Sequence, residues 1–176
     1  MSEPFWIPIG GSIGPTGPQG PQGPQGIQGV QGPASTVIHS VSVRHSVDQT
    51  LNNLAAISFN TEEYDTNNMK RADAARLYAT LAGLYLIILT FEASAHTNGG
   101  FWAGIFHEQL NVDIARENRG ISVNYAQPTN INLSVVHRMA AEESVYARAW
   151  QNSGGGSTIF GNRRDSPKFQ MIKLAD

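Results

Sequence analysis

Acidic side chains gather at two places where their spacing could bind a cation. Glu62, Glu63 and Asp65 stand within four residues, and Asp113 lies four residues before Glu117. Carboxylate oxygens are the ligands that Ca²⁺ prefers in protein loops. Carboxylates on turns are ordinarily solvated, however, so we interpret both clusters as solvated turns. The sequence therefore predicts no cofactor, with calcium as the alternative.

The dipeptide His107-Glu108 begins like the zinc motif of metalloproteases, in which a second histidine follows the first by four positions. Asn111 occupies that position, so we interpret the pair as the end of a strand. The sequence contains no cysteine, which excludes disulfide bonds and thiolate ligands. It also lacks a nucleophile elbow and a phosphate-binding loop. We therefore predict that the protein is not an enzyme.

Two tryptophans could bind a ligand by stacking. Trp102 and Trp150 would stack on sugars if they were exposed at one end of the domain, but we favour buried packing for both. The histidines His39, His96 and His137 stand singly in or beside expected strands. We expect structural hydrogen bonds for them rather than a shared metal site.

Glycine recurs with a period of three near the start of the chain. It occupies Gly11, Gly14, Gly17, Gly20, Gly23, Gly26, Gly29 and Gly32. Only glycine fits at the axis where three polyproline-like chains wind together, so strict Gly-X-Y repetition predicts a collagen triple helix. We assign residues 11–34 to a collagen-like stalk, and we expect two further copies of the chain as partners.

Nothing in the stalk would strengthen such a short triple helix. No charged residue occurs between Glu3 and Arg44, so ion pairs between chains cannot set their register. We expect the stalk to be marginal by itself. The downstream domain should form the trimer first and align the three chains, which offsets the entropy of ordering them.

Residues 1–10 precede the stalk and contain the apolar segment Phe5, Trp6, Ile7, Pro8 and Ile9. Exposed aromatic side chains promote association unless a partner covers them. We interpret this segment as a docking peptide rather than a frayed terminus. It has neither the basic region nor the apolar core of a secretory signal, and we expect no membrane insertion. The net charge of −2 argues against nucleic acid as a partner.

Residues 35–176 have the alternation and turn signals of an all-β domain. The stretch from Asn67 to Ala79 could hold a helical turn, but we favour a loop that leads into a strand. Expected strands cover Val37–Val43, Ala55–Asn60, Leu77–Leu81, Leu84–Ala93, Phe101–Phe106, Ile121–Tyr125, Ile131–Met139, Val145–Trp150, Thr158–Phe160 and Phe169–Leu174. About ten short strands with this spacing predict a β-sandwich or barrel. Expected turns include Glu117–Gly120.

The segment Leu84–Leu89 is apolar at every position. A strand of an ordinary sandwich has one wet face, so we expect both faces of this strand to be covered. In a trimer, a neighbouring subunit would cover the second face. The alternative is a fully internal strand within a single chain.

A collagen stalk followed by an all-β domain resembles the heads of the complement q component and the tumour necrosis factor superfamily. In that family's signature an aromatic residue precedes a Gly-x-Tyr strand. Here Phe59 is followed six residues later by Asp65, and then by Gly83 and Tyr85. The chain departs from the pattern at Lys70. It also departs where Leu77, Ile87 and Leu89 replace aromatics with other apolar residues.

The resemblance implies a ten-stranded jelly roll that forms a threefold-symmetric head over residues 35–176. It also implies which side chains form the core of the head or its trimer interface: Phe59, Leu77, Gly83, Tyr85, Ile87 and Leu89. Within that set, glycine would permit close backbone approach.

Collagen-like stalks with small β-rich tips are typical of bacteriophage tail and head fibres, which this chain resembles. We hypothesise a virion surface protein anchored through its N-terminus to other virion proteins. Its head would meet a receptor or glycan on the host cell. The alternative is a filament protein of a bacterial spore coat or cell surface, whose stalks carry many threonines, whereas this stalk has only Thr16. A secreted binding module is the third class.

Overall fold

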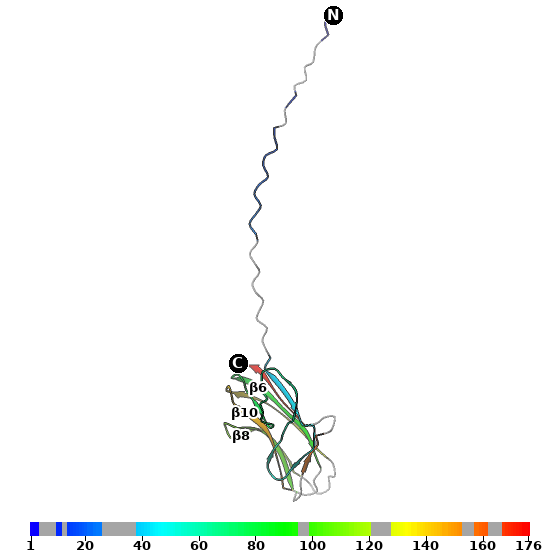
Figure 1. Cartoon of the computed structure of the whole chain (residues 1–176), viewed down its shortest axis with the longest axis vertical. Helices are drawn as coiled ribbons and strands as arrows, with labels where there is room; N and C mark the ends of the chain where they lie inside the picture. Colours follow the sequence, from blue (N-terminus) through cyan, green and yellow to red (C-terminus); the bar gives the residue numbers. More distant parts are fainter. Residues whose placement is uncertain are drawn as a thin grey trace. The chain divides into compact units, whose positions relative to one another are not determined.

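The computed structural model describes residues 1–3, 10–11, 14–25, 38–94, 99–120, 128–152, 157–161 and 167–176. The chain divides into two units, Met1–Ser35 and Thr36–Asp176, which we call the stalk unit and the head. Strands occur only in the head among the described residues, and Figure 1 traces them along the chain. No described helix is long and apolar enough to cross a bilayer.

In the stalk unit, residues 14–25 are exposed and form neither helix nor strand. A Cβ atom added at Gly14, Gly17, Gly20 or Gly23 would meet no atom within 4 Å. The glycine period is therefore not explained by any contact within the described part of this chain. The docking-peptide residues 5–9 lie outside the described residues, as do Gly26, Gly29 and Gly32.

The described part of the head forms twelve strands, which confirms the predicted all-β class. They are β1 (Ser40–Arg44), β2 (Gln49–Leu51), β3 (Ala55–Ala56), β4 (Thr61–Asp65), β5 (Arg76–Tyr78), β6 (Gly83–Ala93), β7 (Gly100–His107), β8 (Val112–Gly120), β9 (Thr129–Met139), β10 (Ser144–Gln151), β11 (Ser157–Ile159) and β12 (Lys168–Ala175). The Asn67–Ala79 stretch is a loop that leads into β5, as favoured from its sequence. Ile121–Tyr125 lies outside the described residues.

The strands form two antiparallel sheets. The first has the order β2-β11-β6-β12-β1-β4, with β9 paired to the other edge of β6. The second has the order β3-β10-β7-β8, with β5 also paired to β10. We call them the β6 sheet and the β10 sheet. Alternate side chains of each sheet point inward, so the two inner faces share one apolar core.

Two segments that we expected to be solvated turns are strands. Glu62, Glu63 and Asp65 lie in β4, which pairs with β1. The Glu117–Gly120 segment continues β8, where Arg119 lies opposite Phe101 of β7. The turn of this hairpin comes earlier, over residues 108–111. These segments form strands because pairing with a neighbouring strand overrides the weak turn preference of their polar residues.

The long strand β6 has one face covered within the single chain. Its alternate residues from Gly83 to Ala93 are buried, whereas Leu84, Leu86 and Ile88 are only half-buried. The buried set faces the β10 sheet, and no described part of the same chain covers the other set. The internal-strand alternative is therefore wrong for the single chain.

Candidate functional site

Most of the residues singled out by the family resemblance lie together in the core of a single chain. Phe59 is 2% exposed, and Leu77, Tyr85, Ile87 and Leu89 are fully buried. The Phe59 ring stacks on Phe169 with centroids 5.4 Å apart. These side chains therefore hold the two sheets together, and a partner chain could not reach them without unfolding the head.

Gly83 lies where β6 begins and the last strand ends. A Cβ atom there would stand 2.4 Å from the carbonyl oxygen of Ala175, and its φ of +158° is one that other residues rarely adopt. Two residues later, the Tyr85 hydroxyl donates a hydrogen bond of 2.7 Å to the carbonyl oxygen of Leu81. Burial raises the pKa of this hydroxyl, against the opposing effect of that hydrogen bond. Gly83 and Tyr85 thus hold the start of β6 against the end of β12 and against the residues that precede β6.

The outer face of the β6 sheet presents an apolar patch to solvent. Leu86 lies between Val136 of β9 and Ile172 of β12, and the three side chains share that face. Val136 is 52% exposed on β9, the strand at this edge of the sheet. Leu84 and Ile88 extend the patch along β6. We call these five residues the assembly face.

A second apolar surface lies at the edge of the sandwich between β8 and β9. Ile114, Leu133 and Val135 pack against the core but remain partly exposed. The inward-facing positions of β9 are therefore not fully covered by the opposite sheet. We call these three residues the open edge, and it differs in position and composition from the assembly face.

The outer face of the β10 sheet carries paired charges. A β-bulge in β8 interrupts the register between Ile105 and Phe106 and places Asp113 on this face. Its carboxylate accepts a hydrogen bond of 2.8 Å from Nε of Arg148 and forms a salt bridge with Nη2 of the same side chain at 2.8 Å. A Cβ atom at Gly104 would stand 3.1 Å from that carboxylate, so the missing side chain makes room for the pair.

A second arginine on the same face is paired twice. Arg76 donates two parallel hydrogen bonds of 2.7 Å to Glu108, a geometry that fixes both groups. It also pairs with Asp73. The Arg76 bonds, followed by a bond from Ser144, hold the pKa of Glu108 below its usual value. Burial acts to raise the pKa of Asp73, but hydrogen bonds from Ala75 and Arg76 lower it overall.

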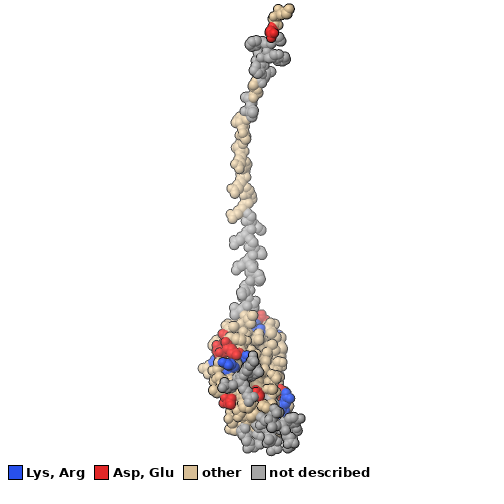
Figure 2. All heavy atoms as spheres, turned by 90° about the vertical axis from the view of Figure 1, so that its right-hand side faces the viewer, with Lys and Arg blue, Asp and Glu red and all other residues tan. Residues whose placement is uncertain are grey.

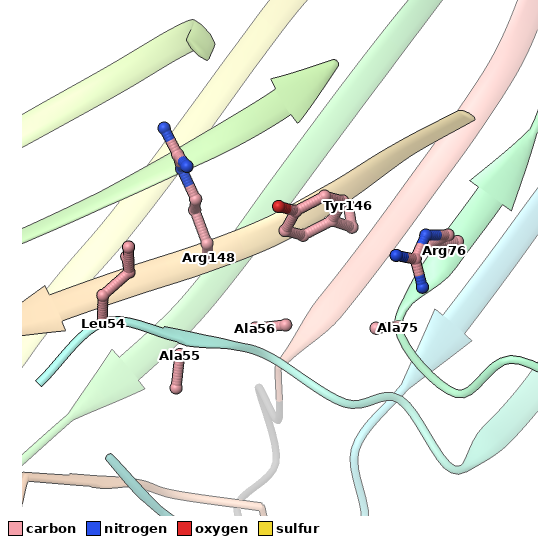
Figure 3. Close-up of a pocket in the computed structure, with 7 residues that line it drawn as sticks. All are labelled: Leu54, Ala55, Ala56, Ala75, Arg76, Tyr146 and Arg148. Carbon is pink, nitrogen blue, oxygen red and sulfur yellow. The ribbon is translucent and has the colours of Figure 1, made fainter. Parts of the chain in front are cut away.

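These arginines border a pocket of about 190 Å³. Figure 3 shows Tyr146 and Arg148 on β10 and Arg76 at the start of β5, with Tyr146 between the two arginines. The Arg76 guanidinium lies 5.4 Å from the Tyr146 ring centroid. The rest of the lining is apolar and consists of Leu54, Ala55, Ala56 and Ala75. We call these seven residues the arginine–tyrosine pocket.

Charges of both signs lie close together elsewhere on the head. On the face seen in Figure 2, acidic and basic side chains form small mixed groups on a largely uncharged surface. The two tryptophans also lie on the outer face of the β10 sheet, opposite each other on β7 and β10, and are half-buried. Arg116 lies 4.0 Å from the centroid of the Trp102 ring. Neither tryptophan is buried in the core, which corrects our expectation.

Two of the carboxylates in the alternative calcium clusters, Asp65 and Asp113, are engaged in other contacts. Asp65 accepts hydrogen bonds from the backbone N–H groups of Asn67, Met69 and Lys70, and Asp113 binds Arg148. Within the described residues, no three acidic or histidine side chains are placed to hold a metal ion. His39 bonds to Thr80 as expected, but Nε2 of His137 is buried with no partner among the described residues.

Sequence reasoning predicted the β6 part of the assembly face, since a neighbouring subunit was expected to cover the second face of Leu84–Leu89. It missed the contributions of Val136 and Ile172, and it missed the arginine–tyrosine pocket. One signal was available, because Tyr146, Arg148 and Trp150 alternate on one face of an expected strand. Their acidic partners could not be found in this way, since Glu108 and Asp113 are more than 30 residues distant from the arginines that they bind.

Solved structures match this fold, although no protein-family model and no curated protein sequence matches the chain. The Eiger tumour necrosis factor of S. frugiperda matches with a TM-score of 0.58 at 9% identity, over 80% of this chain and 95% of that one. Murine APRIL matches with a TM-score of 0.56 at 8% identity, over 77% and 98%. The globular domain of zebrafish complement 1qA gives 0.53 at 11%, over 77% and 95%.

The head has the tumour necrosis factor and complement 1q fold. That finding confirms the jelly roll expected from the Phe59, Gly83 and Tyr85 spacing. The outer face of the β6 sheet exposes an apolar patch, and the outer face of the β10 sheet is polar and aromatic. At such low identity the likeness establishes the fold of this tumour necrosis factor-like head and no more.

Proposed function

We propose that three copies of this chain form a ring through their heads. The supporting observation is that one head carries two different uncovered apolar surfaces, the assembly face and the open edge. Two unlike surfaces fit a head-to-tail contact, in which the open edge of one copy lies on the assembly face of the next. Contacts of this kind close into a ring when the rotation between copies allows it.

The stalk sets the number of copies at three in this proposal. A collagen helix contains three chains, and its glycines are needed because neighbouring chains crowd the axis. In the described part of the single chain those glycines have open space around them. A triple helix supplies the crowding that would make glycine necessary at each of these positions. The fold similarity is compatible with a compact trimeric head.

We further propose that the trimer is a non-enzymatic structural protein of a bacteriophage particle, either a tail fibre or a head fibre. The docking peptide at residues 5–9 would bind another virion protein, and the head would face outward and adhere to the host surface. Support comes from the combination of an apolar N-terminal segment, a Gly-Pro-Gln stalk and a small β head. The same combination supports a spore-coat or cell-surface filament as the second candidate, but Thr16 is the only threonine in the stalk.

Gold-labelled electron microscopy tests this proposal with an antibody against residues 35–176. We expect label on the outside of virions, at the tail tip or at capsid vertices. Label on spores or cell envelopes with none on virions would overturn the phage assignment in favour of the second candidate. Replacing Trp6 with Ala should reduce incorporation into particles while leaving the trimer mass unchanged. Full incorporation of that variant would contradict the docking role.

A further inference from the structure

The arginine–tyrosine pocket has the composition of a binding site for a small uncharged ligand. It lies on the β10 sheet, on the opposite side of the sandwich from the assembly face. A ring formed through the assembly face would therefore leave the pocket open to solvent. Its volume of about 190 Å³ is below the roughly 300 Å³ at which pockets begin to enclose drug-sized molecules, so it fits a group of about one ring.

Hydrogen-bond donors remain available around the pocket. A guanidinium carries five N–H groups. Hydrogen bonds to Asp73 and Glu108 use three of those on Arg76, and the hydrogen bond to Asp113 uses one of those on Arg148, whose Nη2 also forms a salt bridge with the same carboxylate. The Tyr146 hydroxyl adds a further polar group between the arginines (Figure 3). The ligand should therefore carry oxygen atoms that accept hydrogen bonds.

The charge balance disfavours an anionic ligand. Three carboxylates, from Asp73, Glu108 and Asp113, face the two arginines that line the pocket. A ligand carboxylate would lose its water and meet a site with no net positive charge, which is costly. In each arginine–carboxylate pair, N–H groups that donate hydrogen bonds lie beside carboxylate oxygens that accept them. Neighbouring hydroxyl groups of a sugar match that arrangement, since each hydroxyl both donates and accepts.

The apolar side of the pocket favours a neutral sugar that carries a small apolar group. Ala56, opposite Arg148, and Ala75 are small and leave room for a methyl-sized group, and Leu54 beside them is 51% exposed. We propose that the pocket binds one neutral sugar residue that carries an acetamido group. The acetamido methyl contacts the alanines, and its carbonyl oxygen accepts a hydrogen bond from a guanidinium. This inference rests on the proposed adhesive function and names the surface chemistry that the head recognises.

Saturation-transfer NMR and calorimetry on the full-length protein test the proposal with three methyl glycosides: of N-acetylglucosamine, of glucose and of glucuronic acid. We expect single-site binding of the acetamido sugar, at least tenfold weaker binding of glucose, and no binding of glucuronic acid. Equal binding of glucose, or preferred binding of the acid, would overturn the proposal. Displacement of the sugar by an acetylated dialanine amide that binds more tightly would reassign the pocket to a peptide.

Two variants test whether the sugar binds in this pocket. Ala56→Leu fills the cavity from an exposed strand position and should abolish binding without unfolding the head. Tyr146→Phe removes one hydroxyl group and should weaken binding about fivefold. Tyr78→Phe is the matched control, because this tyrosine lies on β5 outside the pocket beneath Arg71. Unchanged binding by Ala56→Leu would overturn the proposal. Absence of sugar binding in protein that still decorates virions would overturn this inference and leave the proposed function standing.

Discussion

The imidazole rings of His107 and His137 lie edge to face with their centroids 5.1 Å apart, and they come from opposite sheets. His107 is fully buried on β7, and its Nε2 atom stands 3.2 Å from the Glu143 carboxylate. Its Nδ1 atom accepts a hydrogen bond of 3.2 Å from the backbone N–H of Leu110. His137, on β9, is the member of the pair whose buried Nε2 has no hydrogen-bond partner in the part of the chain that the structure describes.

This arrangement predicts that mild acid destabilises the head. Burial, together with the nearby His107, lowers the pKa of His137, while Glu143 acts in the opposite direction. Burial also lowers the pKa of His45. The unfolded chain takes up protons first, near its ordinary value of 6.5. Stability is therefore complete above pH 6.5 and declines as the pH falls below that value toward the lowered folded pKa.

Thermal unfolding between pH 7.5 and 5.5 measures the effect, since carboxylates with lowered pKa values do not titrate in that window. His137→Gln should make the melting temperature less sensitive to pH. His39→Gln is the control, because His39 bonds to Thr80 outside the histidine pair. A melting temperature that rises on acidification would contradict the prediction.

Gly83→Ala should destabilise the head by roughly 1–3 kcal/mol, because the new Cβ meets a backbone oxygen at a strained φ. For a domain of this size that loss lowers the melting temperature by about 2–4 °C per kcal/mol. Ala82→Ser, at the exposed neighbouring position, should change little. An unchanged melting temperature for the alanine variant would show that the end of β12 moves away at no cost.

Gly23→Ala should affect only the stalk. A triple helix has no room for a Cβ at its axis, so the collagen signal in circular dichroism should melt at a lower temperature. The melting temperature of the head should stay unchanged, because the head is a compact unit of its own. A collagen signal that melts as in the parent protein would refute the triple-helical reading of residues 11–34.

Val136→Glu should separate the trimer without unfolding the head. The side chain is 52% exposed in the single chain, so the charge is tolerated there but would be buried in the ring. Light scattering should give three times 19.0 kDa for the parent and a smaller mass for the variant. Leu110→Glu is the control, since Leu110 is 53% exposed on the turn after β7. A parent mass of 19.0 kDa would exclude the trimer.

Much of the fold could be predicted from local pattern alone. Alternation along β1, β9 and β10 indicated strands, because a pleated strand turns successive side chains to opposite faces. The spacing of Phe59, Gly83 and Tyr85 pointed to the right jelly roll. The charged strands β4 and β8 were missed, since Glu62 and Glu117 carry no apolar alternation and their strands depend on the partners beside them.

The sequence by itself determined the glycine period, the absence of cysteine and the all-β character of the head, because each depends on residue type and short-range spacing. Only the tertiary structure decided which side of β6 is buried and which acids bind Arg76 and Arg148. Those outcomes depend on strand register and on the bulge at Asp113, which place residues far apart in the chain on one face. Register follows from packing the whole core, and no local segment contains that information.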